Sequence, residues 1–274
     1  MGLYKPTELK AFLADIGAAP MKFLSQNFLI DGNVVRKIVK LANIKKNDSV
    51  LEIGPGPGVL TEELLAQGAT VIAVEKDRKF AAALHRLQTS DLRLQVFEDD
   101  ALKWDPTLHL KPETKLIANL PYNITTPILT HFLPRRELFQ SLTVMVQKEV
   151  GERLLAKPGS KTYGSLSVFV QFYSDPIKGF IVPPTCFYPA PKVQSVVVHL
   201  KLKEPPIPSD TRFFEMTRRA FGQRRKMVHT TLKNHYPLDQ LEEGLMKIGR
   251  GLKVRPEELS LTDFLMLFKI IEQK

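Results

Sequence analysis

The sequence predicts an α/β fold in which a mostly parallel sheet with an antiparallel edge is followed by a small helical domain. Short β-branched runs alternate with helical periodicity in the first two thirds of the chain, as in residues 49–53, 62–67, 70–74 and 77–88. This alternation is typical of βαβ units. A proline-rich segment, residues 203–210, separates this region from a helical remainder.

Five further strands are expected in the first region, at residues 92–97, 115–118, 142–147, 166–172 and 195–202. In the last of them, valines and leucines alternate in part with His199 and Lys201. Such alternation is typical of a half-exposed antiparallel strand rather than a buried parallel one. We therefore expect this strand at an antiparallel edge of the sheet.

The proline-rich segment marks a predicted domain boundary. Its three prolines remove backbone donors and disfavour helix, and Ser209 or Asp210 can cap the helix that follows. We expect one domain over residues 1–205 and a helical domain over residues 206–274. The second domain is helical in pattern from Thr211 onward, with later helices at 238–248 and 256–271.

Composition indicates a soluble globular protein, with 43% hydrophobic and 25% charged residues. The net charge of +10 favours a nucleic acid or an anionic membrane as partner. The first twenty residues lack the apolar stretch of a signal peptide, and no later run approaches the roughly 18 apolar residues that span a bilayer. We expect a cytoplasmic protein without a membrane partner.

The chain has a single cysteine, Cys186, which cannot form an internal disulfide and fits a reducing compartment. It lacks a recognisable partner histidine, so a structural thiol is expected. The six histidines are scattered without metal-ligand spacing. The sequence therefore predicts no metal site.

A glycine-rich turn, VLEIGPGPG at residues 50–58, stands between a predicted strand and a predicted helix. This is the edge at which α/β sheets bind ligands, and Gly54 and Gly56 allow a ligand to approach the backbone closely. Val59 occupies the position where the dinucleotide fingerprint needs a glycine, and the turn lacks Gly-Lys-Ser or Gly-Lys-Thr. Both observations disfavour a nicotinamide cofactor and a phosphate-cradling loop.

Two acidic residues stand at the ends of the next strands. Glu75, about twenty residues beyond the glycines, can accept both hydroxyls of a ribose. Asp100 is placed to accept a hydrogen bond from an adenine amine. A ribose and an adenine without a phosphate describe S-adenosylmethionine, so we expect this cofactor on the Rossmann-like sheet of a class I methyltransferase.

Residues 115–122, KLIANLPY, place an amide, a prolyl turn and an aromatic ring against the expected methyl group. An adenine amine is a poor nucleophile because its lone pair is delocalised into the ring. The Asn119 side-chain oxygen and the Leu120 carbonyl can bind its hydrogens and turn the lone pair toward the methyl sulfonium. Pro121 shapes the turn, and Tyr122 can stack on the base, a contact worth about 1–3 kcal/mol. Positioning for in-line displacement then supplies most of the effect.

Asn-Leu-Pro-Tyr at 119–122 resembles the motif of N6-adenine methyltransferases, and the chain resembles, over nearly its full length, the KsgA family of small-subunit rRNA adenine dimethyltransferases. Residues 22–29, KFLSQNFL, are similar to the amino-terminal cofactor motif of that family, with Ser25 in place of the usual glycine. The resemblance implies cofactor contacts from Asn27 and Leu29.

Residues 187–195, FYPAPKVQS, resemble the F-x-P-x-P-x-V-x-S segment of the same family. The resemblance implies that Phe187 and Tyr122 hold the target adenine between their rings. Without the other motifs, a proline-rich aromatic loop is more often surface packing.

Residues 220–226, AFGQRRK, are similar to the A-F-x-Q-R-R-K segment of the family. Residues 211–236 hold seven Lys and Arg against one acid. On one helix, apolar and cationic residues would occupy opposite faces, and a cationic stripe suits RNA phosphates, although a charge run can also be a solvated face. The expected RNA-binding residues are Arg218, Arg219, Arg224, Arg225 and Lys226.

The resemblance implies two methyl transfers to the N6 amine of each of two adjacent adenosines in the 3'-terminal hairpin loop of small-subunit rRNA. The substrate would be an immature small ribosomal subunit, and we expect a monomer. One alternative is the related large-subunit rRNA methyltransferase that confers macrolide resistance. A DNA adenine methyltransferase is disfavoured because no base-reading domain is evident. The third alternative is a non-catalytic assembly factor, against which the intact Asn119, Tyr122, Glu75 and Asp100 speak.

Overall fold

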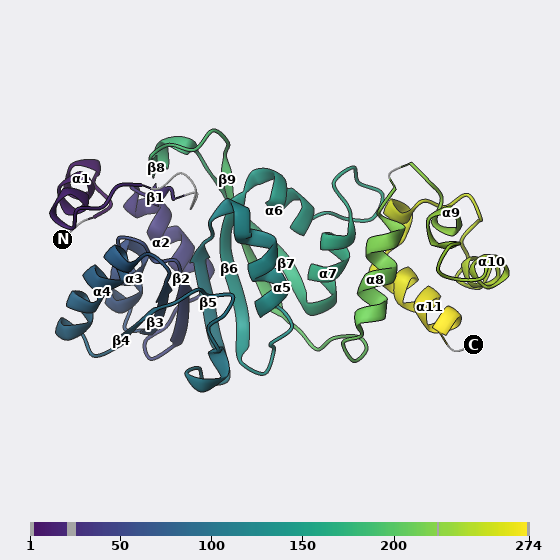
Figure 1. Cartoon of the computed structure of the whole chain (residues 1–274), viewed down its shortest axis with the longest axis horizontal. Helices are drawn as coiled ribbons and strands as arrows, with labels where there is room; N and C mark the ends of the chain where they lie inside the picture. Colours follow the sequence, from purple (N-terminus) through teal and green to yellow (C-terminus); the bar gives the residue numbers. More distant parts are fainter. Residues whose placement is uncertain (1–2, 21–25, 224, 273–274) are drawn as a thin grey trace. The chain divides into compact units, whose positions relative to one another are not determined.

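The structure is a computed structural model that describes residues 3–20, 26–223 and 225–272. The chain forms two compact units, Met1–Gly151 with Pro176–Leu202, and Glu152–Asp175 with Lys203–Lys274. Figure 1 follows the chain through the elements of both units. The boundary expected at 205/206 lies near the second junction, but residues 152–175 belong with the C-terminal residues.

The first unit is built on a seven-stranded sheet with the order β4-β3-β2-β5-β6-β9-β7 (Figure 1). Strands β2 to β6 pair in parallel, and β9 pairs antiparallel with β6. The mostly parallel sheet that the sequence predicts is therefore confirmed. The strands are β2 (Ser49–Ile53), β3 (Thr70–Glu75), β4 (Leu94–Glu98), β5 (Thr114–Asn119), β6 (Phe139–Gln147), β7 (Ser174–Val182) and β9 (Ser195–Leu202).

Helices connect the parallel strands, and side-chain caps fix where two of them begin. Asp31 accepts hydrogen bonds from the backbone of Asn33 and Val34 at the start of α2, and Asp77 accepts from Lys79 at the start of α4. The helices here are α1 (Pro6–Asp15), α2 (Gly32–Leu41), α3 (Val59–Ala66), α4 (Arg78–Ser90) and α5 (Thr125–Phe132), and α6 (Lys148–Leu154) crosses the junction between the units after Gly151; the 3-10 turns are Pro106–Leu108, Tyr122–Ile124 and Pro184–Cys186.

The prediction of a strand at residues 166–172 is wrong, because these residues form helix α7 (Ser165–Tyr173). A short apolar run has no decisive periodicity, so its packing decides its conformation. The Phe172 ring lies 5.5 Å from the Phe213 ring and 4.9 Å from the Phe214 ring, within the second unit. This aromatic contact also places the segment with the C-terminal helices.

Strand β9 pairs antiparallel with β6, as expected, but it is not the edge strand, because it lies between β6 and β7. Its residues Val196, Val197 and Val198 are all buried. Strand β7, which contains Pro176 and Gly179, was not expected from the sequence. An edge strand tolerates proline because a missing backbone donor there costs no ladder bond.

The second unit is helical beyond residue 202, as expected, but the first helix is shorter than its pattern suggests. Helix α8 (Thr211–Ala220) ends before Gly222, and Arg225 adopts a φ of +71° before α9 begins. The continuous cationic stripe expected over residues 211–236 is therefore interrupted. The remaining elements are α9 (Val228–Leu232), α10 (Leu238–Lys247), a 3-10 turn at Pro256–Glu258 and α11 (Leu261–Glu272).

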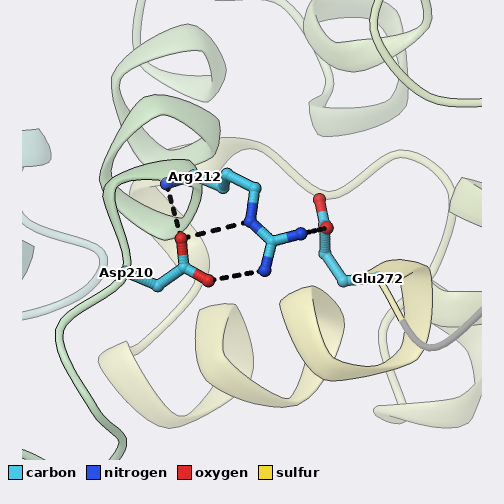
Figure 2. A network of polar contacts seen from close by, with 3 residues as sticks. All are labelled: Asp210, Arg212 and Glu272. Carbon is cyan, nitrogen blue, oxygen red and sulfur yellow. Dashed lines mark hydrogen bonds and ion pairs between the residues drawn. The ribbon is translucent and has the colours of Figure 1, made fainter.

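A polar network joins the start of α8 to the end of α11 (Figure 2). The Arg212 guanidinium donates to Asp210 at 2.8 Å and to Glu272 at 2.6 Å. Asp210 also accepts from the backbone N–H of Arg212 at 2.9 Å and so caps α8. The capping role expected for Asp210 is thereby confirmed. Among the residues that the structure describes, no helix is long and apolar enough to cross a membrane.

Candidate cofactor and base-binding site

A cavity of about 180 Å³ lies at the carboxyl ends of neighbouring strands in the first unit. The strand order brings the ends of β2, β3 and β5 together, because parallel strands present their carboxyl ends at one edge. Nine of the expected site residues line it: Asn27, Gly54, Gly56, Glu75, Asp100, Asn119, Leu120, Pro121 and Tyr122.

The glycine turn is held in place by Glu75. The Glu75 carboxylate accepts the backbone N–H of Gly56 at 2.9 Å and that of Asp77 at 2.8 Å. Gly56 has a φ of +55°, which favours glycine, and a Cβ there would lie 3.2 Å from the Phe28 ring. A carboxylate has about four lone-pair sites, so Glu75 can still accept from a ribose hydroxyl beside its backbone donors, Gly56, Asp77 and Lys76.

A second carboxyl group, Glu52, lies beneath the turn and is only 2% exposed. It accepts a 2.6 Å hydrogen bond from the Thr61 hydroxyl. Burial raises the pKa of Glu52 to about 8, against the opposing effect of the Thr61 hydrogen bond and with a smaller contribution from the nearby Glu75 charge. Burial also raises the pKa of Glu75, against the opposing effect of its backbone donors. Glu52 stands two positions before Gly54, the first glycine of the turn, and was not among the expected site residues.

Glu52→Gln is expected to gain stability relative to the wild type as pH rises. The folded protein keeps this proton to about pH 8, whereas an unperturbed glutamate has a pKa of 4.5. Between these values the folded state binds more protons, so wild-type stability falls by about 1.4 kcal/mol per pH unit from this group. Thermal unfolding of both proteins between about pH 5 and pH 8 measures the difference. A constant difference in Tm over this range would contradict the assignment.

Asn119 is oriented by a backbone carbonyl. Its Nδ2 donates to the Asn27 carbonyl oxygen at 3.0 Å. A carbonyl only accepts, so the amide nitrogen must face Asn27, and Oδ1 is the atom that Asn119 offers to the cavity. The backbone N–H of Leu120 donates to the Met145 carbonyl at 3.1 Å, which ties the next residue to β6.

Tyr122 lines the cavity beside Asn119 and is half-buried. Its hydroxyl is 2.9 Å from the Ser195 hydroxyl oxygen, and burial raises the pKa of the phenol. The phenol therefore stays neutral, and Ser195 holds its hydroxyl end. Ser195 was not expected at the site, although it closes the FYPAPKVQS segment.

Two expected site residues do not line the cavity. Leu29 in β1 (Phe28–Leu29) pairs with Phe187 in β8 (Phe187–Tyr188), and these side chains are 5% and 3% exposed. Both belong to the apolar core of the first unit. The structure thus brings Tyr122 to the cavity but packs Phe187 in the core, and a contact between Phe187 and the base stays a prediction.

Asp100 has a partner that the sequence did not reveal. The Lys76 ammonium donates to Asp100 at 2.8 Å, and the backbone N–H of Leu102 donates to its other oxygen at 3.0 Å. The hydrogen bond from Lys76 holds the pKa of Asp100 below its usual range. Asp100 therefore stays an anionic acceptor at neutral pH, and Lys76 lines the same cavity.

The expected RNA-binding residues lie in the second unit. Arg218, Arg219, Arg225 and Lys226 are exposed, and Arg219 is 3.6 Å from Glu215. Arg224 lies outside the described residues. Because α8 ends at Ala220, these cations occupy the last turn of a helix and the turn after it rather than one stripe.

Cys186 is buried, with its Sγ 3.5 Å from an Asp31 carboxylate oxygen. Burial raises the pKa of this thiol, as suits a structural residue. Within the described part of the chain, no group of three or more His, Cys, Asp and Glu side chains could hold a metal ion.

Comparison with known proteins gives consistent matches. A family model described as "Ribosomal RNA adenine dimethylase" matches residues 19–273. "Ribosomal RNA small subunit methyltransferase A" of Protochlamydia amoebophila is 49% identical, over 98% of this chain and 97% of its own length. The protein of that name from Chlamydia trachomatis is 45% identical, with 97% of each chain covered.

Two solved methyltransferase structures are also similar to this chain. A dimethyladenosine transferase from Plasmodium falciparum has a TM-score of 0.79 and 28% identity, covering 90% of this chain and 98% of its own. The 23S rRNA methyltransferase ErmE has a TM-score of 0.71 and 25% identity, covering 90% of this chain and 100% of its own. The fold is therefore that of a methyltransferase, and the chain belongs to the ribosomal RNA adenine dimethylase family.

Proposed function

We propose that the protein transfers methyl groups from S-adenosylmethionine to the N6 amines of two adjacent adenosines in the 3'-terminal hairpin loop of small-subunit rRNA, giving N6,N6-dimethyladenosine during ribosome assembly. The orientation of Asn119 carries this proposal, because it presents an acceptor oxygen to the cavity. The names of the bacterial relatives favour the small subunit over the large one.

The residues at the cavity fit S-adenosylmethionine. Glu75 offers lone pairs to a ribose, and the anionic Asp100 offers an acceptor to an adenine amine. The left-handed glycine turn leaves backbone exposed to the amino acid portion, and Phe28 and Leu102 add apolar walls. When bound, the cofactor supplies an electrophilic methyl group on a sulfonium.

The chain's own groups act on the target amine. Asn119 Oδ1 and the Leu120 carbonyl each accept a hydrogen bond from the amine. These two hydrogen bonds direct the nitrogen lone pair toward the methyl group. The hydrogen bond from Asn119 Nδ2 to Asn27 orients the Asn119 acceptor before the base arrives, and the bond from the Leu120 N–H to Met145 ties the backbone beside the second acceptor to β6. In the second transfer the monomethylated amine retains one hydrogen, so a single acceptor orients it.

Substrate delivery has two requirements. The target base must leave its stack to reach the cavity, where the Tyr122 ring, held by Ser195, can stack on it. The RNA backbone must also be bound, and Arg218, Arg219 and Lys226 are exposed cations suited to its phosphates. We further propose that the substrate is rRNA within an immature small subunit, and that the protein acts as a cytoplasmic monomer.

Transfer of labelled methyl groups to separate substrates tests the choice of RNA. We expect label in unmethylated small subunits and none in large subunits or duplex DNA incubated in parallel. Label in the large subunit would instead support the macrolide-resistance activity. Cofactor binding without transfer to any substrate would support a non-catalytic assembly factor.

A further inference from the structure

The Tyr122 side chain, which the proposed function places against the target base, is fixed at its backbone end and at its hydroxyl end. Its backbone belongs to the 3-10 turn Tyr122–Ile124, in which the Ile124 N–H donates to the Pro121 carbonyl oxygen at 3.1 Å. The hydroxyl lies 2.9 Å from the Ser195 hydroxyl oxygen. A tyrosine side chain rotates about two bonds, so fixing both ends also fixes the plane of the ring.

The position of Ser195 is set by strand pairing. Ser195 begins β9 and is the register partner of Gln147, the last residue of β6. The Lys148 N–H donates to the Gln194 carbonyl oxygen at 2.9 Å, so the backbone pairing continues one step beyond the ladder. Ser195 is also fully buried, at 0% exposed. Its hydroxyl is therefore a rigid anchor for the phenol.

The contact between the two hydroxyls joins neutral groups, and either of them can donate. Burial raises the pKa of the Tyr122 phenol, so the phenol keeps its proton at neutral pH. Tyr122 lines the cavity, whereas Ser195 does not. Ser195 can therefore act on the reaction through the orientation of the Tyr122 ring and not through contact with a substrate.

We propose that Ser195 is a positioning residue for methyl transfer, whose hydroxyl holds the Tyr122 ring in the plane on which the target adenine stacks. This rests on the proposed function, which assigns the adenine to that ring. The base reaches the cavity after it has left its own stack, and a ring already held in place loses less freedom when the base stacks on it. The end of the FYPAPKVQS segment thus serves the base site, although Phe187 packs in the core.

Single-turnover methyl transfer to unmethylated small subunits, at saturating cofactor and substrate, tests this role. Ser195→Ala removes the hydroxyl and adds no volume, and we expect the rate to fall by about 3–10-fold, the range of one hydrogen bond. Affinities for S-adenosylmethionine and for the small subunit should stay unchanged, because contacts to the RNA backbone position the substrate independently of the base.

Ser141→Ala is the matched control for this loss. Ser141 is a buried serine near the opposite end of the same β6–β9 ladder, and it does not line the cavity. We expect this variant to transfer at the wild-type rate.

A double-mutant cycle separates positioning from a general structural effect. Tyr122→Phe keeps the ring and removes its hydroxyl, so the contact with Ser195 is already lost. In this background Ser195→Ala should lower the rate no further. A structural role for Ser195 would instead lower the rate equally in both backgrounds, which would overturn the proposal. So would a rate for Ser195→Ala equal to that of Ser141→Ala.

Ring resonances of Tyr122 in the free full chain, labelled with ¹³C-tyrosine, test the contact without a substrate. Their assignment follows from their loss in Tyr122→Phe. We expect these resonances to shift in Ser195→Ala and to stay in place in Ser141→Ala. Unchanged resonances in Ser195→Ala would show that its hydroxyl does not hold the ring. Absence of transfer to small subunits by the wild type would refute the proposed function instead, so the two failures are distinguishable.

Discussion

Asn119→Ala is expected to lower the rate of methyl transfer by about 10²–10³-fold without changing RNA affinity. The variant removes the acceptor that orients the adenine amine, and it also removes the hydrogen bond to the Asn27 carbonyl. Asn119 lines the cavity of the first unit, whereas the cations expected to bind the RNA backbone belong to the second unit. Single-turnover rates at saturating cofactor and rRNA, together with equilibrium RNA binding, measure the two effects separately.

Two further variants sharpen this result. Asn119→Asp keeps an acceptor oxygen but loses the donor to Asn27, so it should also be slow if the orientation of the amide matters. Asn33→Ala makes the same chemical change at an exposed residue outside the cavity and should leave the rate unchanged. Wild-type transfer by Asn119→Ala would refute the mechanism.

Glu75→Ala is expected to weaken cofactor binding by at least about 100-fold. The substitution leaves the N–H groups of Gly56 and Asp77 without their acceptor, and a buried unsatisfied donor costs about 1–3 kcal/mol. It also removes the lone pairs proposed for the ribose hydroxyls. Calorimetric titration with S-adenosylmethionine in the absence of RNA measures the loss of affinity directly.

Glu98→Ala is the matched control for this loss. Glu98 is the register partner of Glu75 on β4, but it is exposed and does not line the cavity. Glu75→Gln retains one acceptor oxygen and should fall between the alanine variant and the wild type. Equal affinities for Glu75→Ala and Glu98→Ala would show that Glu75 does not hold the cofactor.

Much of the cofactor cavity could be predicted from the sequence because its residues follow strands. Gly54, Glu75 and Asn119 stand at or just after the ends of parallel strands, and such ends meet at one edge. Strand periodicity and motif spacing therefore place these residues together before any packing is known. The cofactor and the individual roles of these residues stay predictions.

The remaining features depend on tertiary contacts that local patterns do not encode. The Tyr122 hydroxyl meets Ser195, the Lys76 ammonium meets Asp100, and burial rather than spacing decides the protonation of Glu52. The same holds for the segment at 166–172, whose apolar run gave a strand pattern. Its packing against the aromatic rings of α8 selects a helix instead.

The left-handed conformation of Arg225 is a further feature that the sequence conceals. Arginine rarely adopts a φ of +71°, and the amphipathic pattern continues through the residues around it. The pattern therefore predicts one helix where the structure has two, α8 and α9.

Counting N6,N6-dimethyladenosine in rRNA from treated small subunits tests the central claim most directly. Unmethylated subunits are incubated with the protein and S-adenosylmethionine, and the rRNA is digested and analysed by mass spectrometry, with modified positions mapped on the intact RNA. We predict two dimethyladenosines per rRNA, at adjacent positions in the 3'-terminal hairpin loop, and none with Asn119→Ala. Methylation of another base, or modification confined to large-subunit rRNA, would contradict it.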